Sequence, residues 1–179
     1  MFVDNALSFN GGWATPQAIT VTADSSSIVD ITGAGSGNAP TMIGGYPASN
    51  TSIGADWGAG EGVSVPYVYI TVTTAGTTSN TLTVSLNAAP DNGSYSPGTY
   101  TQLYASTAFT GSTLVKGAVL LFPVPPRLQT TAYGEVLPRF YKLTYTCSGS
   151  LTVSVAAGMV INPPTSLTAL QYQNNFVVV

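Results

Sequence analysis

The sequence predicts an all-β protein, more closely a jelly-roll-like two-sheet sandwich of about eight strands with extended ends and one long loop rich in Gly and Ser. Three observations predict this class. Apolar residues alternate with Thr, Ser and Tyr along several short stretches. Gly, Pro and β-branched residues interrupt every stretch long enough for a helix. Only 6% of the 179 residues are charged, and histidine is absent.

The clearest strands are predicted at residues 67–74 and 81–87, where one face of each strand is apolar and the other carries Tyr, Thr, Ser or Asn. The connection at 75–80 contains Gly76, so the two strands are expected to form a hairpin. The remaining strands, in chain order, are predicted at 18–23, 27–32, 99–106, 114–122, 139–146 and 151–156. The order of the strands within the sheets does not follow from this pattern.

The chain has the length of one domain, and two kinds of segment extend beyond the predicted sandwich at 18–161. Residues 1–17 form an amino-terminal interaction segment, and residues 162–179 form a tail that ends in Phe-Val-Val-Val. The loop at 33–62 is several-fold longer than the usual connection of about 4–6 residues. The two ends could contact a neighbouring subunit or pack on the chain's own sandwich, and the sequence leaves both alternatives open. The loop is either a binding element or a plain surface connection.

Candidate interface residues are the aromatic and large apolar residues of these segments and three of the scarce cations, because such residues dominate the energetics of protein interfaces. The alternative for the cations is an ion pair within the fold. The candidates are Phe2, Leu7, Phe9, Trp13, Tyr46, Trp57, Arg127, Arg139, Lys142, Tyr172 and Phe176. Tyr141 and Tyr145 share a strand face with Leu143, which is typical of a core or of a buried interface.

The sequence gives little support for enzymatic chemistry. A Ser-His-Asp site is impossible without histidine, and no serine stands in a Ser-x-x-Lys pattern. Asp56 and Glu61 are the best pair of carboxylates for glycoside cleavage, but carboxylates between loop glycines are usually solvated. The Gly-rich runs at 33–37 and 58–62 lack the helix and the lysine of a phosphate site. We therefore expect no catalytic residue and no cofactor.

The remaining small motifs have structural interpretations. The sequence Asp-Asn-Gly at 91–93 predicts a turn and not a calcium site, because no further acids stand nearby. Cys147 is the only cysteine, so an intrachain disulfide is impossible, and we expect a small strand residue. No metal site is expected.

Charge and hydropathy limit the partners. The chain has four Lys and Arg residues against seven Asp and Glu residues, too few cations for a groove that follows nucleic-acid phosphates. No apolar stretch approaches the roughly 18 residues of a membrane span, and an acid stands where a secretory signal has basic residues. We expect cytosolic synthesis and neither nucleic acid nor membrane as a partner.

Three stretches of the second half, together with the start Met-Phe-Val-Asp, resemble the capsid cement proteins of certain short-tailed bacteriophages. They are LLFPVPP at 120–126, LPRFYKLTYT at 137–146 and GSLTVSV at 149–155. In that family a strand of the type Arg-Tyr-Leu-Arg-Leu-Asn-Tyr follows a Pro-rich loop. The resemblance covers about half of the chain by strand patterns. This chain departs from the shorter members in its 33–62 insertion and at Phe140 and Lys142.

The resemblance implies a jelly roll that forms a small homo-oligomer, a dimer or a trimer, on the outer surface of an assembled capsid. There it bridges adjacent copies of the major capsid protein and so stabilises the shell. Low positive charge also favours the outer side over the side that faces packaged DNA. The alternative is a receptor-binding or carbohydrate-binding β-sandwich of a virion, which would use the aromatic residues and the long loop to contact sugars.

Overall fold

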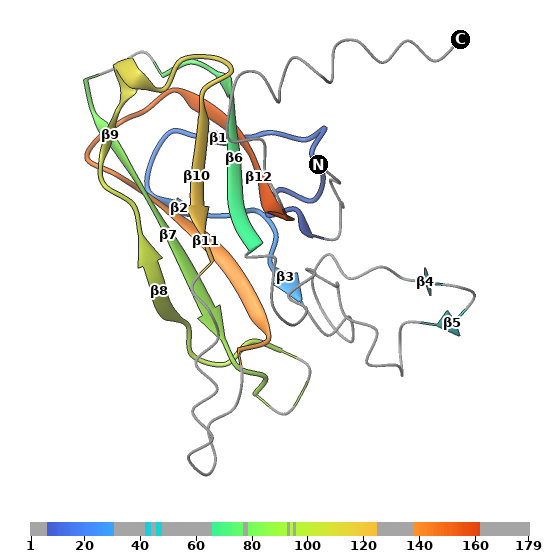
Figure 1. The fold of residues 1–179 in the computed structure, drawn as a ribbon. Coiled ribbons are helices and arrows are strands. Elements are labelled where there is room, and N and C mark those ends of the chain that lie inside the picture. Colours follow the sequence, from blue (N-terminus) through green and yellow to red (C-terminus); the bar gives the residue numbers. More distant parts are fainter. Residues whose placement is uncertain are drawn as a thin grey trace, which may run out of the picture.

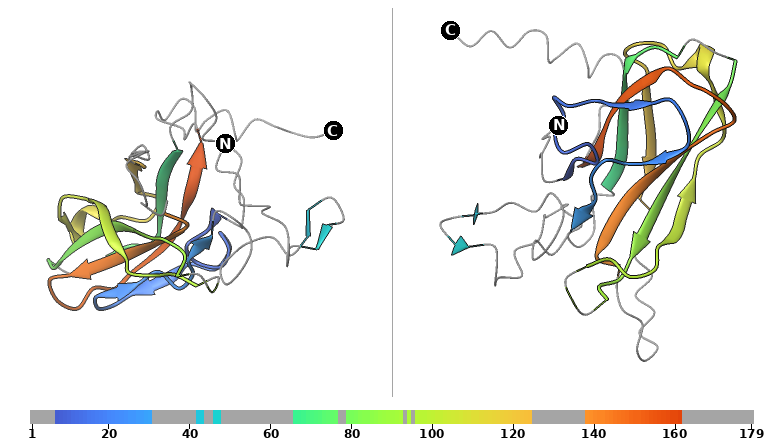
Figure 2. Two further views of the ribbon diagram at one scale, coloured as in Figure 1. Left: turned by 90° about the horizontal axis from the view of Figure 1, so that it is seen from below. Right: turned by 180° about the vertical axis from the view of Figure 1, so that it is seen from behind.

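The computed structural model describes residues 7–30, 42–43, 46–47, 66–76, 79–92, 94, 96–124 and 138–161, and for residues 42–43, 46–47 and 161 only the backbone. These residues form two antiparallel sheets packed face to face, as the sequence predicted (Figure 1). Two further views show the same two layers from below and from behind (Figure 2). No α-helix occurs in the described part, which contains the short 3₁₀ turn η3 (Gly111–Thr113).

We call the two layers sheet A and sheet B. Sheet A contains, in spatial order, β1 (Gln17–Ile19), β12 (Val153–Ile161), β6 (Pro66–Thr74) and β10 (Val119–Pro123). Sheet B contains, in spatial order, β2 (Ala23–Asp24), β11 (Phe140–Cys147), β7 (Thr81–Ala89) and β8 (Thr101–Ala105). Two short strands extend sheet B, β3 (Val29–Asp30) beside β11 and β9 (Phe109–Thr110) beside β7. Within the predicted loop, β4 (Met42–Ile43) pairs with β5 (Tyr46–Pro47).

The order of the strands is that of a jelly roll. When β1, β2, β6, β7, β8, β10, β11 and β12 are taken as its main strands, the first pairs with the last, the second with the seventh, the third with the sixth, and the fourth with the fifth. The contacts β12 to β6 and β11 to β7 then complete the two sheets. This pattern arises when one long antiparallel hairpin rolls up into two layers. The predicted fold class is confirmed.

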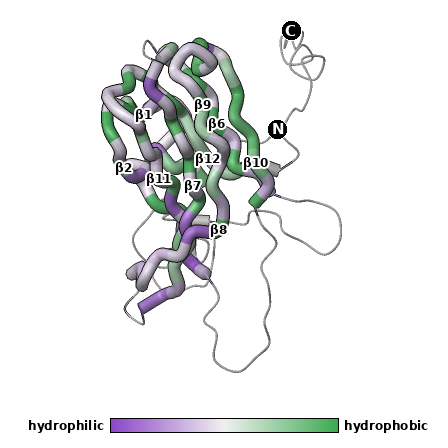
Figure 3. The backbone as a smooth tube through the Cα atoms, turned by 90° about the vertical axis from the view of Figure 1, so that its left-hand side faces the viewer, coloured by the Kyte–Doolittle hydropathy of each residue, from purple (hydrophilic) through white to green (hydrophobic). Residues whose placement is uncertain are grey.

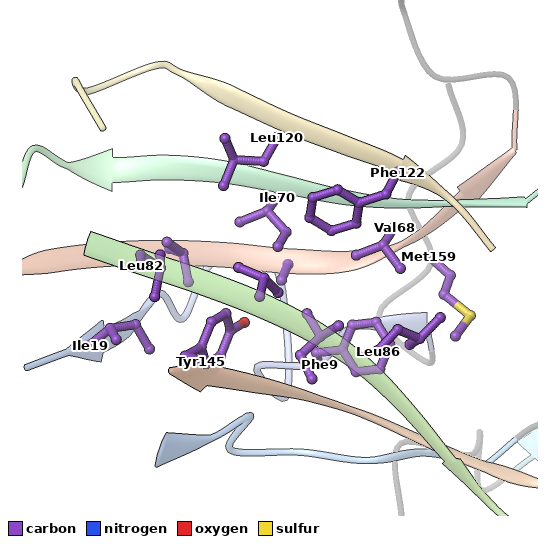
Figure 4. Close-up of a cluster of buried hydrophobic side chains, with 14 of the residues drawn as sticks. Phe9, Ile19, Val68, Ile70, Leu82, Leu86, Leu120, Phe122, Tyr145 and Met159 are labelled. Atoms are coloured by element: carbon purple, nitrogen blue, oxygen red, sulfur yellow. The ribbon is translucent and has the colours of Figure 1, made fainter. Parts of the chain in front are cut away.

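The alternating pattern of the sequence accounts for the core between the sheets. In β6 the residues Val68, Ile70 and Val72 are at most 1% exposed, and in β7 the apolar residues of the alternation are buried against them. Figure 4 shows these side chains pointing at one another from the two layers. Tyr141 and Tyr145 are also fully enclosed, which confirms that their strand face belongs to the core. Figure 3 shows the apolar stretches along the strands and the most hydrophilic described stretches at one end, below β8.

The predicted hairpin and two predicted strands need correction. The stretches 67–74 and 81–87 form β6 in sheet A and β7 in sheet B, which do not pair, so the chain crosses between the two layers after β6 and forms no hairpin there. The stretch 18–23 is not one strand, because Ile19 ends β1 in sheet A and Ala23 begins β2 in sheet B, so the chain changes layers between them. Alternation continues through such a crossing and does not reveal it. The strand predicted at 114–122 begins only at Val119, because Gly117 has a φ of 87° and turns the chain just before it.

The described part of the amino-terminal segment belongs to the sandwich. Phe9 is fully buried and Leu7 is 6% exposed, and both contribute to the main core. The amide of Phe9 donates to the carbonyl of Ala157 at 2.9 Å, and Ser8 forms a bridge with Gly158. Residues 7–9 therefore lie along β12 beyond the end of β1. Of the two alternatives for the amino-terminal segment, residues 7–9 therefore follow the second and pack on the chain's own sandwich.

Candidate interaction surface

The described residues contain no constellation that resembles a catalytic or metal centre. No group of three His, Cys, Asp or Glu side chains in the described ranges is arranged to hold a metal ion. Cys147 ends β11, and its partial burial raises the pKa of the thiol, which disfavours the reactive thiolate. Asp56, Glu61 and the two Gly-rich runs lie outside the described residues.

Arg139 is held inside the fold by two carboxylates at the end of sheet B. Its Nε and Nη2 donate to the two oxygens of Asp30 at 2.9 and 2.8 Å, and its Nη1 donates to Asp91. Asp30 is fully buried and Arg139 is 8% exposed. Burial alone would lower the pKa of Arg139, but hydrogen bonds and charge from Asp30 and Asp91 raise it overall. We call these three residues the ion cluster.

The ion cluster joins three separate parts of the chain and covers an apolar side chain. Asp30 ends β3, Asp91 follows β7, and Arg139 immediately precedes β11. The guanidinium carbon of Arg139 lies 4.8 Å from the ring centroid of Phe140, which is fully buried on the outer side of sheet B. Arg139 thus acts as an internal tie and is not exposed for a partner, which corrects its prediction as an interface residue. The reason is that a buried carboxylate needs a paired cation.

Lys142 also pairs within the chain, but at the surface. Its Nζ donates to Asp24 at 2.6 Å and lies 4.4 Å from the ring centroid of Tyr100. Burial raises the pKa of Asp24, but hydrogen bonds from Lys142 and Thr144 and the charge of Lys142 bring it below its ordinary value. Burial, with the Asp24 charge second, raises the pKa of Tyr100 to about 12. The outer face of sheet B is therefore polar and carries charge.

The turn after β7 has the form predicted for Asp-Asn-Gly. The side-chain oxygen of Asn92 accepts a hydrogen bond from the amide of Ser94 at 2.8 Å, and the Asn92 amide donates to the Ser96 carbonyl at 3.0 Å. Such side-chain to backbone bonds are what Asn contributes to turns. Asp91 serves the ion cluster, so this site is structural.

The outer face of sheet A differs from that of sheet B because its strands contain no Asp, Glu, Lys or Arg. The register of the strands sets out three rows across β10, β6 and β12 on this face. The rows are Val119, Thr71 and Ala156; Leu121, Tyr69 and Gly158; and Pro123, Tyr67 and Val160. Each row is apolar, aromatic or hydroxyl-bearing.

Trp13 covers part of this face. Its ring lies 6.0 Å from that of Tyr69, and it packs so close to Gly158 that a β-carbon there would come within 2.5 Å of Trp13 Cζ2. Tyr69 is consequently 6% exposed. Trp13 itself is half-buried, so one of the predicted anchors lies at the surface, beside the uncovered rows.

The uncovered part of the face lies over β6 and β10, and we call it the β6–β10 strip. Val119 is 38% exposed, which is unusual for a valine within a strand. The neighbouring side chains on the outer face of β6 and β10 are exposed or half-buried, and none of them is charged. The strip consists of Tyr67, Thr71, Val119, Leu121 and Pro123.

Sequence reasoning found only half of this surface. The alternation in 67–74 placed Tyr67 and Thr71 on one face, but nothing in the sequence indicated that Val119 and Leu121 lie beside them. Their pairing joins residues about fifty positions apart, and such long-range register has no local signal. The other predicted interface residues lie outside the described residues, or, for Tyr46, have an undescribed side chain. They are Phe2, Tyr46, Trp57, Arg127, Tyr172 and Phe176.

Comparisons with known proteins add no assignment. No protein-family model matches the chain, and no curated protein has a significantly similar sequence. Within the described ranges, no helix has the length and hydropathy needed to cross a membrane.

Proposed function

We propose that this chain is a structural virion protein, a capsid cement or decoration protein that binds the outer surface of an assembled phage capsid as a homo-oligomer and bridges major capsid proteins. The observation that carries the proposal is the β6–β10 strip, an uncharged apolar surface on a rigid sandwich. The resemblance of the strand sequences to cement proteins supports it.

The physical requirement for a cement protein is contact area with little desolvation cost. Burying ionised side chains at an interface is expensive unless each one finds a partner, whereas Thr, Tyr and Val lose little on burial. Two of the three described cations fit this account, since Arg139 and Lys142 are already paired within the chain, while Lys116 lies in the exposed turn before β10. A protein that binds only the assembled lattice adds its binding free energy to the stability of the shell, about 2.7 kcal/mol per site at a concentration 100 times Kd.

The two sheets offer a matched pair of variants to test this proposal. Thr71 on sheet A and Thr83 on sheet B are both half-buried threonines on the outer side of a central strand. We expect Thr71→Lys to weaken binding of the purified protein to expanded capsids at least about tenfold, because the lysine would be desolvated without a partner. Thr83→Lys should leave binding within about twofold of the original protein.

Binding is measured by co-sedimentation with expanded and unexpanded capsids. Retention on the expanded lattice alone supports the proposal. Equal loss of binding in both variants would assign the contact to another surface. Binding to free sugars without any binding to capsids would replace the proposal with the carbohydrate-binding alternative.

A further inference from the structure

The second edge of β10 is unpaired within the described residues. β10 is the last strand of sheet A, and among the described strands it pairs with β6 alone. Across the sandwich it meets β8 through the rings of Phe122 and Tyr104, 5.4 Å apart, but β8 belongs to sheet B and does not pair with it. A row of backbone donors and acceptors is therefore exposed along this edge.

The hydrogen bonds around β10 identify which groups point to the open edge. The amide of Val124 donates to Pro66, and the carbonyl of Ala118 accepts from Val72, so even-numbered residues bond toward β6. Along an antiparallel strand the direction of these groups alternates. The amides of Val119 and Leu121 and the carbonyls of Val119, Leu121 and Pro123 must therefore face the open edge.

Pro123 fits this assignment. Proline has no amide hydrogen, so a strand tolerates it only where that hydrogen would face away from a partner. Pro123 is exposed and odd-numbered, so its missing donor lies on the open edge and costs sheet A no hydrogen bond. The tripeptide before it, 120–122, is apolar throughout.

Edge strands usually carry features that block further pairing, and the two edges on this side of the sandwich differ in this respect. β8 has a register irregularity between Leu86 and Asn87 that leaves Leu103 without an opposite residue, a bulge of the kind that blocks further pairing. β10 pairs with β6 in unbroken register and contains no charged residue. The edge of β10 therefore remains suited to accept another strand.

The chain itself contains a segment with the chemistry of such a strand. Residues 162–179 contain no charged side chain and end in Phe176-Val177-Val178-Val179, a run of residues that favour β-structure. Eighteen residues span up to about 60 Å when extended, enough to reach another molecule. Asn162 and Pro163 both precede a proline, which favours extended backbone and disfavours an immediate reversal toward the chain's own sheet.

We propose that the carboxyl-terminal segment Phe176–Val179 of a second copy of this chain adds as a strand to the open edge of β10. Its backbone bonds to the outward amides and carbonyls of Val119 and Leu121, and its alternate side chains lie beside these two residues, so the added strand widens sheet A and leaves the β6–β10 strip open. The exchange is reciprocal between two copies, each of which donates one segment to the other, and it therefore builds a closed dimer. The inference supplies the self-contact that the proposed function includes and rests on that proposal only in this respect.

The first test removes the donor. The molar mass of the full chain and of a chain ending at Asn174 is measured by sedimentation over a range of concentrations, with circular dichroism as the check on folding. We expect the full chain to be oligomeric and the shortened chain to be monomeric, with a dissociation constant raised at least about tenfold. An unchanged oligomer in the shortened chain, or a monomeric full chain, would overturn the proposal.

The second test changes the acceptor and keeps the donor. Val119→Lys places a charge on the open edge, and Val21→Lys places the same charge at a valine that is 59% exposed and belongs to neither sheet. Val119→Lys should weaken oligomerisation at least about tenfold, and Val21→Lys should leave it within about twofold. Equal behaviour of the two variants contradicts docking at β10.

A peptide of residues 171–179 tests for strand addition itself. It is titrated into the shortened chain, unmodified and with a single N-methyl group at Val177 or at Val178. Because neighbouring amides of a strand point in opposite directions, one methyl group should abolish binding and the other should preserve most of it. Equal binding of all three peptides would refute a backbone-paired strand.

Capsid binding separates this inference from the proposed function. Shortened chains that are monomeric and still bind expanded capsids support the strand exchange and leave the cement proposal standing. If the chain ending at Asn174 and the Val119→Lys variant both stay oligomeric and still bind capsids, the strand exchange alone is refuted. Loss of capsid binding in Thr71→Lys with intact oligomers supports the strip as the capsid contact and also supports the strand exchange, which uses the edge of β10 and not its outer face.

Discussion

The outer faces of the two sheets each cover buried apolar side chains, but they do so by opposite means. On sheet B, Arg139 and its two carboxylates lie over Phe140. On sheet A, the ring of Trp13 lies over Tyr69 and Gly158 with no charge nearby. Among the described residues, the charged side chains other than Lys116 lie on one side of the sandwich, so the other side can be buried again at low cost.

This division explains how so little charge is compatible with a stable fold. Of the described Asp, Lys and Arg residues, all but Lys116 lie on sheet B or at its ends. A charged group on sheet A would raise the cost of every contact made by that face. A partner that covers sheet A therefore meets hydroxyl, aromatic and aliphatic groups only.

The largest expected effect is at the ion cluster. Arg139→Ala leaves Asp30 buried without its cation, and removal of one partner from a buried pair typically costs about 3–5 kcal/mol. We expect a loss of that size in the free energy of unfolding, measured with urea at pH 7. A loss below about 1 kcal/mol would mean that the cover of sheet B does not depend on charge.

A smaller effect is expected where Trp13 covers sheet A. The β-carbon added by Gly158→Ala would lie 2.5 Å from Trp13 Cζ2 and 2.9 Å from the Leu7 carbonyl oxygen, so Trp13 must move. We expect a loss of about 1–3 kcal/mol together with a red shift of Trp13 fluorescence, measured in a Trp57→Phe background. In a Trp13→Ala chain the same glycine substitution should cost less, because only the Leu7 contact remains.

Alkaline pH distinguishes the core from the outer face of sheet B. Burial raises the pKa of Tyr145, and burial together with Asp24 raises that of Tyr100 to about 12. Above about pH 10 the unfolded chain loses these protons and the folded chain keeps them, so the stability present below that pH falls as pH rises. Tyr145→Phe should reduce this fall by up to about 1.4 kcal/mol per pH unit, and Tyr100→Phe by less, because solvent screens its half-buried hydroxyl.

The free energy of unfolding of Tyr145→Phe at pH 7 serves as a control. The buried hydroxyl of Tyr145 has no hydrogen-bond partner in the structure, so Tyr145→Phe should leave stability unchanged or raise it there. A loss of more than about 1 kcal/mol at pH 7 would show that the hydroxyl is bonded in solution.

The smallest effect is expected at Lys142. Lys142→Ala removes a pair with Asp24, whose side chain is 49% exposed, and exposed pairs contribute about 0–1 kcal/mol. The pKa of Asp24 lies below 3.8, so this contribution is present at neutral pH and lost as pH falls below that value. Urea unfolding at pH 7 and pH 3 measures the difference. An effect as large as that of Arg139→Ala would remove the distinction between the buried and the exposed pair.

The sequence predicted the sandwich because alternation is a local signal. Each of the strands β6, β7 and β11 displays its buried face directly, as in Val68, Ile70 and Val72. The jelly-roll order was not contained in that signal, because it depends on contacts such as that of Gln17 with Val155, far apart in the chain. Short segments with irregular backbone, such as β9, also lacked the length for a pattern.

The site was less predictable than the fold. Residue type pointed to Leu7, Phe9 and Arg139 as interface residues, but an aromatic or cationic side chain has the same appearance in a sequence whether it is buried or exposed. The polar residues Ser8 and Asn10, which hold residues 7–12 against β12, gave no signal. The hydrogen bond that Asn10 accepts from the amide of Ala157 exists only after β12 is in place.

The antiparallel pairing of the first and last main strands has a mechanical consequence. Gln17, at the start of β1, lies opposite Val155, and residues 7–9 continue toward the far end of β12, so both chain directions leave sheet A at the same end. Tension applied through the two ends would break the hydrogen bonds between β1 and β12 one after another. It would not load all of these bonds at the same time. A load transmitted through the ends would therefore peel the sandwich at low force, whereas a load spread over the face of sheet A would be shared by the strands at once.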